Sequence, residues 1–174
     1  MTKPELFTCG FGAHQPKPYH YKECGLDNIF LLNGFTLEDV DGEEYVSIDN
    51  VDGLWKAIGI NLVAKQKTFS PSEIRFLRSQ MDLTQAELAK FLRVDDQTVA
   101  RWEKKHCKMP GPADLALRFL FLSSEVAQPE GGEIVQRAHE LIKEIVDRDE
   151  PLADMLHFSH GAITDSWEPQ RMYA

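Results

Sequence analysis

The sequence has no long apolar run, few cysteines and a shortage of positive charge. None of its apolar runs approaches the roughly 20 residues that a membrane-spanning helix needs. The first residues also lack the apolar centre of a signal peptide, so we expect a cytoplasmic protein without membrane contact. The three cysteines are an odd number at irregular spacing, which indicates reduced thiols rather than a disulfide framework.

The familiar catalytic patterns are missing as well. The chain contains no glycine loop that would cradle a phosphate, no nucleophile elbow and no His-Glu-x-x-His pattern. The acidic residues between Glu38 and Glu44 fit a charged turn better than a cation site, and His157 and His160 fit the surface of a tail. We therefore expect neither an enzyme nor a cofactor.

Positive charge is scarce overall but concentrated in one window. Nineteen Lys and Arg residues oppose 28 Asp and Glu residues, which gives a net charge of -9. Such a balance argues against DNA binding, because cationic side chains supply most non-specific affinity for phosphates. Between Lys65 and Lys108, however, ten basic residues oppose six acidic ones. This asymmetry points to a polyanion-binding segment, and the alternative is a solvated charged face.

The first third of the chain has the pattern of a small β-containing module that ends in a helix. After an irregular lead-in over residues 1–18, aromatic and β-branched runs alternate with turn dipeptides that end in glycine. This alternation predicts a small antiparallel sheet. Asn50 can then cap a helix whose apolar residues recur at intervals of three and four up to Val63, before a short hinge at 65–67.

The middle of the chain carries clear helix-start signals. Ser70-Pro71-Ser72-Glu73 and Thr84-Gln85-Ala86-Glu87 are both capping boxes, and Asp95 or Asp96 can cap a third helix. A fourth helix is predicted from about Gly111-Pro112 to residue 122. Four short helices with brief connections indicate a compact helical domain.

The last part of the chain is predicted to hold one more helix and an apolar tail. Residues 133–148 place aliphatic side chains along one face, which can pack on the same chain or pair in a dimer. The tail from 151 to 174 is too apolar for simple disorder, and we expect it to dock, for example on a partner subunit. The expected fold is mainly α. It comprises a β-containing module at 1–64, a helical domain at 68–125, and a C-terminal helix with a docking tail at 133–174.

The string from Ile74 to Glu103 resembles the Xre/Cro family of helix-turn-helix regulators. The resemblance lies in Leu-Thr-Gln-x-Glu-Leu-Ala-x-x-Leu-x-Val, followed by Thr-Val-x-x-Trp-Glu and by a downstream proline, Pro110. It implies a four- to five-helix DNA-binding domain that covers about a third of the chain. Where the family has a glycine after the third helix, this chain has Lys105.

The residue types on the predicted third helix fit that role on physical grounds. Val99 and Trp102 face the core, which leaves Asp96, Gln97 and Arg101 pointing outward to read bases. Arg101 can pair with guanine and Gln97 with adenine, whereas Asp96 is either a cytosine reader or a helix cap. Donors toward phosphate are expected from Gln85, Thr98, Lys104, Lys105 and Lys108.

The segment from Tyr19 to Leu31 resembles the N-terminal region of MqsA-type antitoxin regulators. In that family two Cys-x-x-Cys pairs flank the segment and hold zinc. Here the first pair is reduced to Cys9 with Gly12, and the second position reads Glu38 to Gly42. The remaining candidate ligands have a spacing that matches no familiar zinc finger, so we expect no metal. These candidates are Cys9, His14, His20 and Cys24.

The sequence therefore predicts a DNA-binding transcription regulator that acts as a dimeric repressor or autoregulator. A homodimer implies a palindromic operator on double-stranded DNA, with half-sites about one helical turn apart. One alternative is an antitoxin that represses its own operon and binds a toxin through the N-terminal module. Another is a protein-interaction module that has lost DNA binding.

Overall fold

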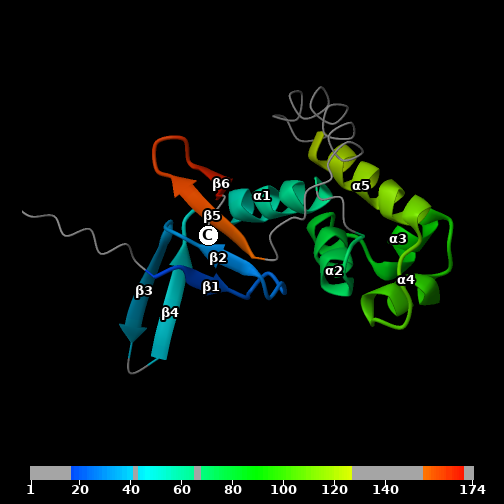
Figure 1. Ribbon diagram of the computed structural model, residues 1–174, viewed down its shortest axis with the longest axis horizontal. Coiled ribbons are helices and arrows are strands. Elements are labelled where there is room, and N and C mark those ends of the chain that lie inside the picture. The colour runs from blue at the N-terminus through cyan, green and yellow to red at the C-terminus, as the bar shows by residue number, and fades with distance from the viewer. Residues whose placement is uncertain (1–16, 41–42, 65–67, 127–154, 171–174) are drawn as a thin grey trace, which may run out of the picture.

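The computed structural model describes residues 17–40, 43–64, 68–126 and 155–170. In these residues five helices from the middle of the chain are flanked by N-terminal and C-terminal strands, which makes a mixed α/β fold (Figure 1). The expectation of a mainly α fold thus holds only for the middle of the chain. None of the helices in the described ranges is long and apolar enough to cross a membrane. The helix expected at 133–148 and the hinge at 65–67 lie outside the described residues.

Strands from both ends of the chain form one four-stranded sheet. Its order is β1 (Tyr19–Tyr21), β2 (Ile29–Leu31), β5 (Leu156–Gly161) and β6 (Ser166–Gln170). The outer pairs are antiparallel, but β2 and β5 run parallel, with Ile29 opposite Leu156 and Leu31 opposite Phe158. The expected antiparallel sheet is therefore mixed, and part of the expected docking tail docks on the N-terminal strands of its own chain.

A separate hairpin follows the first two strands. β3 (Phe35–Val40) pairs with β4 (Glu43–Ile48), at the end of the molecule opposite α3 and α4 (Figure 1). The acidic residues expected in a charged turn lie instead on the two arms of this hairpin, since Glu38 and Asp39 belong to β3 and Glu43 to β4. The turn prediction was therefore wrong for Glu38, Asp39 and Glu43, which stand in the strand register opposite Tyr45, Glu44 and Val40.

Helix α1 (Val51–Val63) lies between the strands and the other helices (Figure 1). Its start is the predicted cap, because the Asn50 side chain accepts a hydrogen bond from the Gly53 N–H. Leu54, Ile58 and Leu62 are buried, as the spacing predicts. Gly59 faces helix α5, and a Cβ there would collide with the Phe121 ring. The glycine therefore allows the two helices to approach closely.

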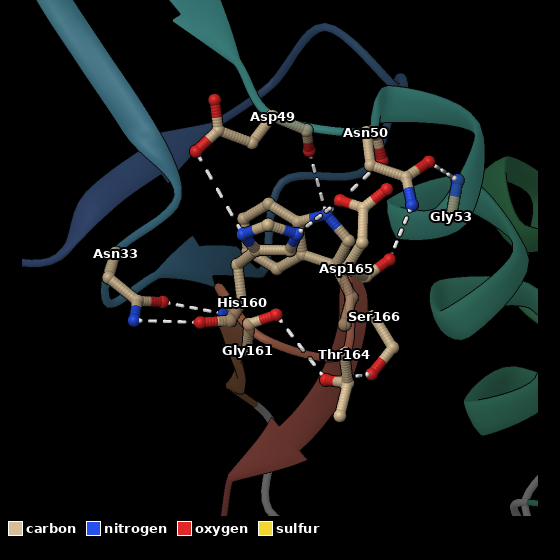
Figure 2. A network of polar contacts seen from close by, with 10 residues as sticks. Asn33, Asp49, Asn50, Gly53, His160, Gly161, Thr164, Asp165 and Ser166 are labelled. Atoms are coloured by element: carbon tan, nitrogen blue, oxygen red, sulfur yellow. Dashed lines mark hydrogen bonds and ion pairs between the residues drawn. The ribbon is translucent and has the colours of Figure 1, made fainter.

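The connection between the C-terminal strands and α1 is polar and centred on His160 (Figure 2). The His160 imidazole lies between two carboxylates, with Nε2 3.0 Å from Asp165 and Nδ1 3.8 Å from Asp49. The Trp167 indole N–H donates to the Asp49 carbonyl at 2.9 Å, and the Asn50 side-chain amide donates to the Asp165 carbonyl at 2.6 Å. The His160 side chain is only 8% exposed, so the expectation of a surface histidine was wrong.

The remaining helices follow the predicted start signals. They are α2 (Pro71–Gln80), α3 (Gln85–Leu92), α4 (Asp96–Glu103) and α5 (Gly111–Val126). Both capping boxes are formed, with Ser70 and Glu73 at α2 and with Thr84 and Glu87 at α3. Asp95, one of the two proposed caps, starts α4 by accepting from the Thr98 N–H.

A buried ion pair fastens α5 to the segment that joins α1 and α2. Arg118 Nε donates to Asp114 Oδ2 at 2.8 Å, and Arg118 Nη1 donates to the Val63 carbonyl at the end of α1. The other Asp114 oxygen accepts from the Phe69 N–H at 3.0 Å, and the Arg118 guanidinium lies 4.2 Å from the centre of the Phe69 ring. Because Val63 and Phe69 stand on either side of residues 65–67, one ion pair fixes both ends of that connection.

Candidate nucleic-acid interface

Helices α3 and α4 are joined by a tight three-residue turn. Arg93 begins it in the left-handed conformation, with φ 54°, and the Val94 N–H donates to the Ala89 carbonyl at 3.0 Å. Ala89 is 3% exposed, and its small side chain lets the two helices approach closely. This short turn therefore sets how α4 crosses α3.

Helix α4 separates into a buried face and an exposed face. Val99 and Trp102 belong to the core, as predicted. Asp96, Gln97 and Arg101 are exposed, and the last two are one helical turn apart on the same face. The structure therefore places two of the three predicted base-reading residues, Gln97 and Arg101, on one exposed face, with Asp96 exposed in the first turn of the helix. Asp96 is not the cap, and its carboxylate accepts from the Gln97 N–H at 2.9 Å.

The inner end of α4 is held by a buried carboxylate that the sequence did not single out. Glu103 is 4% exposed and accepts two hydrogen bonds from Arg78 of α2, at 2.6 and 3.1 Å. Arg78 also donates to the Leu83 carbonyl at 2.8 Å, which ties the same guanidinium to the entry of α3. This network links α2, α3 and α4 and fixes the orientation of the exposed face of α4.

The protonation of Glu103 is set by two opposing effects. Burial by itself would raise the pKa of this carboxyl group. The hydrogen bonds from Arg78 and Gln85, with the nearby guanidinium charges, outweigh burial and hold the Glu103 pKa below its usual range. The carboxylate is therefore ionised at neutral pH, and the Arg78–Glu103 pair stays charged on both sides.

Two of the predicted phosphate contacts have partners within the protein. The Gln85 side-chain amide donates to Glu103 Oε2 at 2.8 Å, so one of its two N–H groups is used inside the helical network. The Thr98 hydroxyl donates to Asp95 Oδ2 at 2.8 Å. Gln85 keeps one amide hydrogen for an external acceptor. The only hydroxyl hydrogen of Thr98 is already donated to Asp95, so Thr98 has none left for a phosphate.

The three predicted phosphate-binding lysines lie at the C-terminal end of α4. Lys104, Lys105 and Lys108 are all exposed. The chain turns away from the helix through a Schellman motif, in which the Lys105 N–H donates to the Trp102 carbonyl and the His106 N–H to the Arg101 carbonyl. Lys105 itself has φ 65°, in the region that favours glycine. Lys105 thus takes the left-handed conformation at the position where the resemblance implied a glycine.

Replacing Lys105 by glycine is expected to raise the free energy of unfolding by about 1 kcal/mol, because glycine adopts a positive φ without the cost that a side chain imposes. Urea denaturation at neutral pH measures this change. Lys104→Gly is the matched control, since Lys104 has φ -99° and gains no relief. If Lys105→Gly were no more stable than the unmodified chain, this account of the turn would be contradicted.

The candidate zinc ligands do not assemble a metal centre within the part of the chain that the structure describes. No group of three His, Cys, Asp or Glu side chains is placed there to hold an ion. His20 donates to the Asp27 carbonyl at 2.7 Å and stacks on Phe30, and burial raises the pKa of the Cys24 thiol. Cys9 and His14 lie outside the described residues.

Three charged residues of this region had no predicted role, namely Arg78, Glu103 and Arg93. Arg93 is exposed and carries a positive charge in the turn before α4. Its signal was position, since a cation in the α3–α4 turn lies beside the expected reading helix. For Arg78 and Glu103 the signal was weaker, because 25 residues separate two charges that meet only when the helices pack.

In comparisons with protein-family models, with curated proteins and with solved structures, no match was found for this chain.

Proposed function

We propose that this chain is a sequence-specific DNA-binding transcription regulator of helix-turn-helix type, acting as a dimeric repressor or autoregulator. The observation that carries the proposal is the exposed face of α4, where Gln97 and Arg101 lie one turn apart. Side chains at such positions reach base edges when the helix enters the major groove. The resemblance of residues 74–103 to the Xre/Cro family supports the same role for α4.

The charge distribution supports separate roles for the lysines, which would contact phosphates, and for the exposed face of α4, which would contact bases. Lys104, Lys105 and Lys108 extend the cationic surface beyond Arg101 and would contact the phosphate backbone. The Glu103 carboxylate is buried under two guanidinium groups and so adds little repulsion toward phosphate. In a homodimer, two such helices would read a palindromic operator with half-sites about one helical turn apart.

Arg101→Ala is expected to weaken binding to the selected operator by about 1–3 kcal/mol, roughly 5- to 150-fold, and to relax specificity at one base pair of each half-site. The reason is the loss of a bidentate contact with a guanine edge. Lys104→Ala should instead weaken binding to all sequences alike and lower the slope of log affinity against log salt by about 1 per contact. Mobility shift with operator and scrambled duplexes measures both effects.

Unchanged binding by both variants would contradict this docking of α4. Absence of any shift by the unmodified chain at low salt would favour the rival proposal, a protein-interaction module with a helical fold that no longer binds DNA. Glu168→Gln serves as a control, because Glu168 is an exposed residue of β6, outside the helical domain. This variant should bind DNA as the unmodified chain does.

A second candidate function is an antitoxin that represses its own operon. The β3–β4 hairpin favours it, because Leu37 and Tyr45 are 47% and 54% exposed among acidic neighbours. The register sets Leu37 opposite Val46 and Tyr45 opposite Glu38, so the two side chains lie on opposite faces of the hairpin, and a basic protein partner would contact one exposed apolar side chain on each face. The presence of a small toxin-like gene beside this one, and loss of toxin neutralisation by Leu37→Ser/Tyr45→Ser with DNA binding intact, would support this reading.

A further inference from the structure

A groove of about 380 Å³ lies between the first turn of α2 and the loop that follows α4. Its floor is apolar and consists of the core side chains Phe69, Ile74, Trp102 and Met109. A volume of this size is in the range of small-molecule sites. Two aromatic side chains in the floor favour a flat, aromatic ligand over an extended chain.

The rim of the groove is cationic. Lys105 and Lys108 line it together with His106, all three of them exposed, and none of the lining residues is acidic. An anion at the rim would therefore meet two ammonium groups without a repelling carboxylate in the groove. A ligand that complements the site needs an apolar aromatic body and one negative charge at its edge.

We propose that this groove binds a small aromatic monocarboxylate, with the ring system on the apolar floor and the carboxylate between Lys105 and Lys108. Occupancy has a consequence that rests on the proposed function, because these lysines are also the ones assigned to DNA phosphates. A carboxylate that pairs with them removes cationic charge from the DNA-facing loop. Binding of the ligand then lowers the affinity for DNA, and binding of DNA lowers the affinity for the ligand by the same factor.

The thiol of Cys107 provides a direct reporter, because it is exposed and lines the groove. The probe is naphthalene-2-carboxylate, added to the full chain without DNA while iodoacetamide alkylates the thiol. Peptide mass spectrometry follows the alkylation rate of Cys107 alone. We expect saturable slowing of at least threefold, with a midpoint on the order of 1 mM as suits a ligand of this size. The neutral naphthalene-2-carboxamide and acetate each lack one half of the required chemistry and should give no slowing at the same concentration.

Variants separate the site from a general effect on the thiol. In Lys105→Gln/Lys108→Gln the ratio of rates with and without naphthalene-2-carboxylate should return to about 1, whereas Lys90→Gln, an exposed lysine on α3, should keep the full ratio. Equal slowing by the carboxamide, or full protection in the double variant, would overturn the proposal. So would protection that rises with protein concentration without ligand, because a second copy would then fill the groove.

A mobility shift then tests the coupling to DNA. Naphthalene-2-carboxylate should weaken duplex binding at least threefold, and the carboxamide should leave it unchanged. If the unmodified chain binds no DNA, the proposed function fails, but protection of Cys107 still decides the groove proposal because that assay contains no DNA.

Discussion

Arg118→Met is expected to lower the free energy of unfolding by about 3–5 kcal/mol, the usual cost of removing one partner from a buried ion pair. The methionine fills much of the space of the arginine stem but leaves the Asp114 side chain without its guanidinium partner. The Val63 carbonyl at the end of α1 loses a donor as well. Urea denaturation of the full chain at neutral pH measures the loss.

Two further variants show whether the ion pair is the cause. Arg101→Met changes an exposed arginine in the same way and should alter stability by no more than about 0.5 kcal/mol. Asp114→Leu combined with Arg118→Met removes both charges and should recover part of the loss. Recovery stays incomplete because the Phe69 N–H then has no acceptor. A loss below about 1 kcal/mol in Arg118→Met would contradict the role given to this pair.

Glu103→Gln is expected to cost about 3 kcal/mol at neutral pH, because the Arg78 guanidinium is then left buried beside a neutral amide. The side chains of Glu103 and Arg78 are 1% and 15% exposed, so water screens little of this loss. Glu168→Gln replaces an exposed carboxylate and should leave stability nearly unchanged. Equal, small effects of the two variants would refute a structural role for the Arg78–Glu103 pair.

Glu103→Gln should also change how the free energy of unfolding depends on pH. The folded-state pKa of Glu103 lies below its usual value. The carboxylate therefore contributes its full stability above a pH of about 4.3, its unfolded value, and loses it as the pH falls through the lower folded pKa. The unmodified chain should lose stability across this acidic window, and Glu103→Gln should lose less. Parallel stability curves for the two proteins would show that the carboxylate is not stabilised by folding.

Local signals in the sequence predicted the helical part of the molecule well. The capping boxes at Ser70 and Thr84 are satisfied by atoms within four residues, so their outcome depends little on the rest of the fold. The buried positions Val99 and Trp102 follow from the helical period, and that period also leaves Gln97 and Arg101 outside. The candidate reading face was therefore available from sequence alone.

Interactions between distant residues were not available in that way. The parallel pairing of β2 with β5 joins Ile29 to Leu156, and no local pattern states which strands will pair. His160 looked like a tail residue because its buried position depends on Asp49 and Asn33, which lie more than a hundred residues earlier. The hydrogen bond from Gln85 to Glu103 could not be predicted either, because only helix packing brings these two side chains together.

Selection of duplexes from a random pool by the full, unmodified chain tests the central proposal most directly. The proposal predicts enrichment of a two-fold symmetric sequence with half-sites about one helical turn apart. Binding to it should weaken steeply with salt, and Arg101→Ala should lose the preference at one base pair in each half-site. Enrichment of no sequence, at a salt concentration low enough to retain duplex on the protein, would contradict sequence-specific recognition by α4.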